Sequence, residues 1–207
     1  MPYLIGLTGN IACGKSSVGE IARRLGADYV DADSIVHELL GPGTECSARV
    51  AQRFAAFGIR RPDGGIDRRA LGAVVFADPA ALADLERILH PAVRQELERR
   101  QTTSNHEVFI IDAIKLIEGG LADRVDCVWV VACPRTAQLA RLTTTRGLTS
   151  AEAALRIDAQ GSQAEKLRRA DVVIQNDGTR EALEAQVTAA YRDALARARS
   201  RNREKHP

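Results

Sequence analysis

The residues with the clearest chemical meaning form one loop near the N-terminus. Its sequence, GNIACGKS over residues 9–16, fits the phosphate-binding pattern G-x-x-x-x-G-K-S/T. An apolar run at 3–7 precedes the loop and a helical apolar pattern at 15–25 follows it, which is the context that this pattern requires. The glycines let consecutive backbone N–H groups point inward, and the helix N-terminus adds partial positive charge. The loop therefore predicts the binding of a nucleoside triphosphate.

Two carboxylates follow the second predicted strand, in the sequence Asp31-Ala32-Asp33. Their spacing of two places both side chains on the same side, just past the carboxyl end of the strand and beside the phosphate loop. A carboxylate there can accept the proton of an acceptor hydroxyl or hold a water of Mg²⁺. Aspartate is also a good helix N-cap. We favour a catalytic role for Asp33, whereas for Asp31 a cap and a functional role stay equally open.

Other charged residues follow the later strands. Asp112 closes the third strand, where phosphate-loop proteins keep an acid that is aimed at Mg²⁺, although a turn residue fits equally well. Arg141 and Arg146 lie on a helix between the fourth and fifth strands, where a mobile lid would fold over the phosphates. Each arginine alone is also compatible with a solvated helix face.

Apolar runs alternate with helical patterns along most of the chain. This alternation predicts an α/β fold, a parallel five-stranded sheet with helices on both faces. The expected strands are 3–7, 28–31, 108–112, 126–132 and 171–175. The expected helices are about 15–25, 33–40, 44–57, 67–75, 79–102, 135–146, 150–158, 160–169 and 179–200.

One stretch breaks the alternation, because residues 41–104 contain no convincing strand and form an expected helical insertion. It carries His90-Pro91 and Arg94, a possible anion-binding patch, although a lone histidine is more often a surface or packing residue. The expected division is a nucleotide-binding core of 1–40, 105–134 and 170–200, a helical acceptor-binding lobe of 41–104, a lid of 135–169 and a basic tail of 201–207. We interpret the tail as a solvated helix end.

Composition limits the classes of function. Hydrophobic residues make up 45% of the 207 residues and the net charge is +2, so the chain reads as a globular protein without a strong field for nucleic acid or membrane. We expect neither as a partner, and a monomer or a weak homo-oligomer. The four cysteines lack metal-ligand spacing and read as small core residues of a reducing compartment. No signal peptide or apolar stretch of about 18 residues is evident, which predicts a cytoplasmic location.

Taken together, these segments resemble the dephospho-CoA kinase family. The resemblance rests on IGLTGNIACGKSSV, DADSIVHELLGPGT, IDRRALGAVVFADP, ILHPAVR, RLTTTRGLT, RIDAQ and KLRRADVVIQNDG, in that order over nearly the whole chain. It implies a P-loop kinase fold, adenylate-kinase-like, with a helical substrate lobe and a lid. It also implies transfer of the γ-phosphoryl group of ATP to the ribose 3′-hydroxyl of dephospho-CoA, with Mg²⁺.

The resemblance assigns roles to individual residues. Asp33 becomes the catalytic base, and Lys15 and Arg141 become catalytic ligands of the γ-phosphate. Ser16 is the expected Mg²⁺ ligand, with Asp112 behind it. The implied ATP-binding residues are Gly9, Asn10, Ile11, Ala12, Cys13, Gly14, Lys15, Ser16, Ser17, Arg141, Arg146, Asn176 and Gly178. The implied acceptor-binding residues are Asp33, His90, Pro91 and Arg94, and we expect Lys115 to contact the acceptor as well.

Two positions depart from the family pattern. Asn10 replaces a usual glycine, and because asparagine tolerates positive φ we expect the loop to form. Lys115 places a charge where an apolar residue that faces the substrate is usual.

Two other readings compete with this one. Another small-molecule kinase, acting on a nucleoside or a shikimate-like alcohol, shares the loop, the carboxylates and the lid but gives no reason for the HPxxR segment. A regulatory GTPase would need an N/T-K-x-D motif, and the chain offers Gln175-Asn176-Asp177-Gly178 instead.

Overall fold

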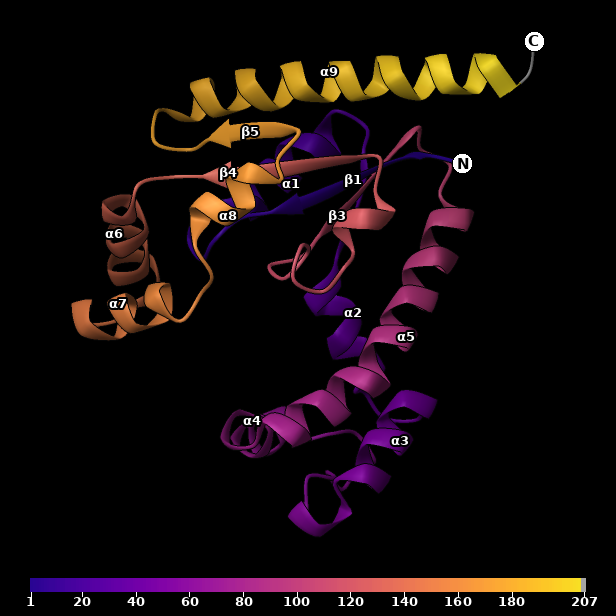
Figure 1. The fold of residues 1–207 in the computed structure, drawn as a ribbon, viewed down its shortest axis with the longest axis vertical. Helices are drawn as coiled ribbons and strands as arrows, with labels where there is room; N and C mark the ends of the chain where they lie inside the picture. Colours follow the sequence, from indigo (N-terminus) through magenta and orange to yellow (C-terminus); the bar gives the residue numbers. More distant parts are fainter. Residues whose placement is uncertain (206–207) are drawn as a thin grey trace. The chain divides into compact units, whose positions relative to one another are not determined.

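The computed structural model describes residues 1–205 and divides the chain into two compact units. One unit combines Met1–Val30 with the chain from Ser104 onward, and the other is Asp31–Thr103. Figure 1 follows the chain through both units.

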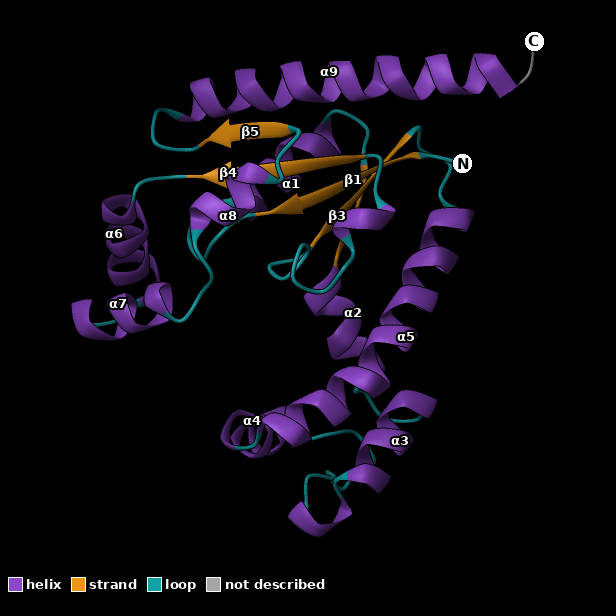
Figure 2. Ribbon diagram, viewed as in Figure 1, coloured by secondary structure: helices purple, strands orange, loops and turns teal. Residues whose placement is uncertain are grey.

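A five-stranded sheet forms the centre of the first unit (Figure 2). Its strands are β1 (Tyr3–Thr8), β2 (Asp28–Asp31), β3 (Val108–Asp112), β4 (Cys127–Ala132) and β5 (Val172–Gln175). The spatial order is β2-β3-β1-β4-β5, and β1 pairs in parallel with both β3 and β4. Because all carboxyl ends of a parallel sheet lie at one edge, the segments that follow β1, β3 and β4 meet there.

One face of the sheet is covered by α1 (Lys15–Arg24) and α9 (Arg180–Lys205). Alternate residues of β1, Ile5 and Leu7, join one buried cluster with Ile21 of α1 and Val187 of α9. The alternation follows from the period of two along a strand. Burial of these side chains anchors the helix that begins directly after the phosphate loop.

The opposite face is covered by α8 (Gln163–Arg168) and by the segment between β3 and β4, which contains the short helix η2 (Ala122–Arg124). Gly6 permits this packing, since a Cβ atom there would lie 2.6 Å from Cδ2 of the fully buried Leu116. Helices α6 (Arg135–Arg146) and α7 (Ser150–Asp158) follow β4 in the sequence, precede α8 and pack against each other.

The second unit is helical. Its elements are α2 (Ala32–Leu39), α3 (Glu45–Arg53), η1 (Ala55–Phe57), α4 (Arg68–Ala77) and α5 (Pro79–Thr103). Val50 and Phe54 lie at the centre of its own apolar cluster, which α4 and α5 complete with Leu71 and Leu85. Helix α5 continues through Pro91, as its apolar spacing predicts.

All five expected strands are present, and the helix bounds agree with the expected ones to within a few residues except at α9. That helix reaches Lys205, and two arginines near its end pair with acidic residues of the same unit. Arg199 pairs with Glu107 at 3.0 Å, and Arg201 pairs with Asp126 at 2.7 Å and donates to the main-chain oxygens of Met1 and Pro2. Residues 206 and 207 of the predicted tail lie outside the described residues. None of the helices within residues 1–205 contains a run that is long and apolar enough to cross a membrane.

Candidate functional site

The loop after β1 curls through three residues with positive φ, namely Gly9 at 153°, Ala12 at 60° and Gly14 at 96°. Only glycine fits at position 14, because a Cβ atom there would also lie 2.1 Å from Nδ2 of Asn176. Inside the loop, the Cys13 N–H donates to the Asn10 carbonyl at 3.1 Å. Asn10 itself does not have positive φ, so the expectation that it needs this tolerance was wrong and the strained non-glycine residue is Ala12.

Lys15 begins α1 and lies beside the acid at the end of β3. Its Nζ is 3.9 Å from Oδ1 of Asp112, and it donates to the Gly9 carbonyl at 3.4 Å. The Asp112 side chain is buried and accepts a hydrogen bond of 2.6 Å from the Tyr29 hydroxyl. Ser16 lies in the first turn of α1 with an exposed side chain. An ammonium, a hydroxyl and a carboxylate therefore gather where the first N–H groups of a helix have no partner inside it.

Arg141 of α6 lies against the outside of the phosphate loop. Its Nη1 donates to the carbonyls of Ala12 and Cys13 at 3.0 and 3.3 Å, and its Nη2 donates to the carbonyl of Asn176 at 2.7 Å. The Asn176 side chain donates to the same Cys13 carbonyl at 2.7 Å. The segment after β5 and the helix after β4 thus converge on the carbonyl side of the loop.

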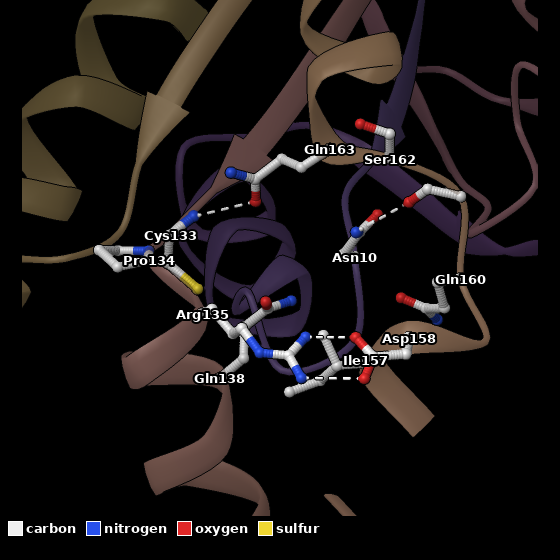
Figure 3. A pocket seen from close by; sticks show the side chains of 11 residues that line it. Asn10, Cys133, Pro134, Arg135, Gln138, Ile157, Asp158, Gln160, Ser162 and Gln163 are labelled. Atoms are coloured by element: carbon white, nitrogen blue, oxygen red, sulfur yellow. Dashed lines mark hydrogen bonds and ion pairs between the residues drawn. The ribbon is translucent and has the colours of Figure 1, made fainter. Parts of the chain in front are cut away.

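Three glutamines from the α6–α8 region contact the first half of the loop. Gln160 accepts a hydrogen bond from the Ile11 N–H, Gln138 donates to the Ile11 carbonyl, and Gln163 accepts from the Cys13 thiol. These glutamines line a pocket of about 440 Å³ together with Asn10 and the Arg135–Asp158 ion pair that joins the start of α6 to the end of α7 (Figure 3).

The two carboxylates after β2 have different local roles. The Asp31 side chain accepts from the Asp33 N–H at 2.9 Å and is the N-cap of α2. This assigns the cap, which the sequence left open, to Asp31. Asp33 is an exposed residue in the first turn of α2 and does not cap it.

The remaining predicted residues belong to separate segments. His90 and Pro91 are exposed in the middle of α5, and Arg94 donates to the His90 carbonyl one turn away at 3.1 Å. Lys115 is exposed in the turn after β3, and Arg146 is the exposed last residue of α6. Ser17 lies exposed in the first turn of α1, and Gly178 lies in the turn between β5 and α9.

Comparison with known proteins gives consistent matches. A family model described as Dephospho-CoA kinase matches residues 3–182. The chain is 46% identical to a dephospho-CoA kinase of Symbiobacterium thermophilum, over 92% of this chain and 81% of that relative. It is also 46% identical to the one of Geobacter sulfurreducens, over 89% and 94%. The solved dephospho-CoA kinase from Campylobacter jejuni superposes with a TM-score of 0.72 at 29% identity, over 95% of this chain and 98% of that one.

The chain belongs to the dephospho-CoA kinase family. This confirms the resemblance found in the sequence, and with it an ATP-dependent phosphotransferase of coenzyme A biosynthesis. A regulatory GTPase is thereby excluded.

Sequence reasoning missed several residues of this dephospho-CoA kinase that contact the phosphate loop or the segment after β3. Neither Gln138 nor Gln160 belongs to an apolar periodic pattern or a charged motif. Gln160 also follows the end of α7, where polar residues are common. Lys166 of α8 is buried and donates to the Ile114 carbonyl at 2.9 Å and to Glu118 at 2.7 Å. A helical apolar pattern with lysine on its inner face could have indicated it.

Two thiols lie behind the loop. The sulfur atoms of Cys13 and Cys133 are 3.3 Å apart, and both residues are buried. Burial, together with the neighbouring Cys13 thiol, raises the pKa of Cys133 well above its ordinary value. Burial likewise raises the pKa of Cys127 in β4 to about 11. Because the thiolate is the nucleophile, a raised pKa and burial together lower the reactivity of Cys127 and Cys133.

We therefore expect iodoacetamide at pH 8 to leave Cys127 and Cys133 unmodified in the native protein. In urea the same cysteines regain an ordinary pKa and full access, so they alkylate rapidly. Peptide mass spectrometry after timed quenching measures both rates. Native alkylation of Cys133 at the rate of a free cysteine would contradict this description of the site.

Proposed function

We propose that the protein transfers the γ-phosphoryl group of ATP to the ribose 3′-hydroxyl of dephospho-CoA, giving coenzyme A and ADP. The observation that carries this proposal is the curled loop of residues 9–16 in a chain that belongs to the dephospho-CoA kinase family. Phosphoryl transfer depends mainly on positioning and on electrostatic stabilisation. We infer that the residues around this loop supply both the positioning and the electrostatic stabilisation.

On the nucleotide side, the loop residues hold the triphosphate through backbone N–H groups at the start of α1. Lys15 neutralises charge on the β- and γ-phosphates, and Arg141 adds a guanidinium from α6. The contacts of Arg141 with the Ala12 and Cys13 carbonyls support this role, because they keep its charge against the loop. Asn176 and Gly178 lie near the adenine in this proposal, and Arg146 belongs to the lid.

The oxygen donors beside Lys15 fit Mg²⁺. This ion prefers oxygen ligands and binds through one or two carboxylates together with waters and substrate phosphates. Ser16 and the buried Asp112, whose second oxygen accepts from Tyr29, are such donors. They would hold Mg²⁺, which supplies positive charge beside the β- and γ-phosphates.

On the acceptor side, Asp33 acts as the general base that removes the proton of the 3′-hydroxyl. The assignment of the α2 cap to Asp31 supports this role, because the helix does not need Asp33 for capping. His90, Pro91 and Arg94 of the helical lobe, together with Lys115, contact the acceptor. Residues 135–169 act as the lid.

The direct test offers dephospho-CoA beside adenosine, AMP and shikimate, with ATP and Mg²⁺. Product analysis by mass spectrometry should show ADP and coenzyme A formed in equal amounts, and Lys15→Ala should abolish both. Faster phosphorylation of any of the other three acceptors would overturn the assignment of the acceptor and leave the kinase fold in place.

Asp33→Asn tests the catalytic base. It should lower kcat by about 10²–10⁴-fold, the usual contribution of general-base catalysis, while the Kd for ATP stays unchanged. Asp31→Asn is the matched control, since asparagine caps helices as well as aspartate does and should preserve activity. If Asp33→Asn retains more than about half of the wild-type kcat, Asp33 is not the base.

A further inference from the structure

Both polar groups of the Ile11 backbone are held by side-chain amides from outside the loop. The Ile11 N–H donates to Oε1 of Gln160 at 2.6 Å, and the Ile11 carbonyl accepts from Nε2 of Gln138 at 2.8 Å. Gln138 is 4% exposed and is the fourth residue of α6, whereas Gln160 lies between α7 and α8. Two separate segments therefore hold one residue of the phosphate loop from two sides.

These two hydrogen bonds fix more than Ile11 itself, because each peptide unit is planar and trans. The Ile11 carbonyl and the Ala12 N–H share one peptide plane, so Gln138 also sets the direction of the Ala12 N–H. The Asn10 carbonyl and the Ile11 N–H share the preceding plane, so Gln160 sets the direction of the Asn10 carbonyl. That carbonyl accepts the Cys13 N–H at 3.1 Å, inside the turn.

The residue that follows these planes is strained. Ala12 has a φ of 60°, a conformation that side-chain-bearing residues adopt at a cost and keep only when their surroundings hold them. A further contact comes from the same region, since Nδ2 of Asn10 donates to the Gly161 carbonyl at 3.1 Å (Figure 3). The external hydrogen bonds thus fall on the loop just before its strained residue.

We propose that Gln138 and Gln160 are positioning residues that preorganise the phosphate loop for the triphosphate of ATP. They act through the Ile11 backbone, whose N–H donates to Gln160 and whose carbonyl accepts from Gln138. The proposal rests on the proposed function for the identity of the nucleotide. It predicts that loss of either hydrogen bond weakens ATP binding and leaves the affinity for dephospho-CoA unaffected.

Methionine substitutions remove these hydrogen bonds and keep the side-chain length. Gln138→Met and Gln160→Met should each raise the Kd and the KM for ATP about tenfold, the effect of leaving one part-buried polar group of Ile11 without its partner. The KM for dephospho-CoA should stay within about twofold. Gln52→Met, at an exposed position of α3, is the matched control and should behave as the wild type does.

Glutamate substitutions separate the direction of each hydrogen bond from charge and size. Glu at position 160 keeps an oxygen that accepts the Ile11 N–H, whereas Glu at position 138 places an oxygen against the Ile11 carbonyl. Both variants add the same charge beside the same residue. Gln160→Glu should therefore bind ATP at least about tenfold more tightly than Gln138→Glu.

Titration calorimetry with ATP alone gives Kd, steady-state assays give both KM values, and Trp129 fluorescence follows unfolding of the sheet unit. If the methionine variants do not fold, the glutamate pair decides. An unchanged Kd in both folded methionine variants, or equal Kd values for the glutamate pair, would overturn the proposal. Failure to phosphorylate dephospho-CoA would instead overturn the proposed function, because the Kd for ATP is measured without any acceptor.

Discussion

The site depends on one backbone constraint, namely that residues 9–16 must turn tightly between the end of β1 and the start of α1. Ala12 and Gly14 supply this turn with positive φ, and at Ala12 the conformation opposes the intrinsic preference of the residue. Strain of this kind persists only where neighbouring structure over-determines it. The contacts around the loop therefore hold Ala12 in this conformation.

Those contacts come from three segments that are distant in sequence. Arg141 and Asn176 hold the carbonyls of Ala12 and Cys13, and Gln138 and Gln160 hold the Ile11 backbone. The sheet brings these segments together, because the segments after β1, β4 and β5 all leave the same edge of three neighbouring strands. Burial of β1 beneath α1 and α9 then anchors the start of the loop. These contacts and this burial together fix the position of residues 9–16.

Much of this arrangement could be predicted from the sequence, since the signals are local. The strands appear as buried apolar runs, the loop appears as spaced glycines before Lys15, and α5 keeps its apolar period through Pro91. The contacts of Gln138 and Gln160 could not be predicted in this way. The sequence around a glutamine looks the same whether its side chain faces solvent or donates to a backbone carbonyl. Only the tertiary structure distinguishes the two cases.

Local context also decided the cases in which pattern reasoning misjudged a residue or left it open. Asp31 and Asp33 have equal capping propensity, and the choice between them depends on where β2 ends and α2 begins. Asn10 replaces a glycine without taking up positive φ, because the turn places its strain at Ala12. In α9, Arg201 reaches Asp126 and the N-terminal backbone, which no helical pattern reveals.

If the backbone curl of the loop holds the triphosphate, a Gly14→Ala substitution must weaken ATP binding, which calorimetric titration with ATP measures. Alanine is strained at the positive φ of this position, and its Cβ would lie too close to the Asn176 amide. We therefore expect the affinity for ATP to fall at least about tenfold. Gly72→Ala in α4, where the added Cβ makes only ordinary contacts, should bind ATP as the wild type does. Native Trp129 fluorescence verifies that both variants fold. A folded Gly14→Ala protein whose affinity for ATP is within about twofold of the wild-type value would show that the curl of the loop does not hold the triphosphate.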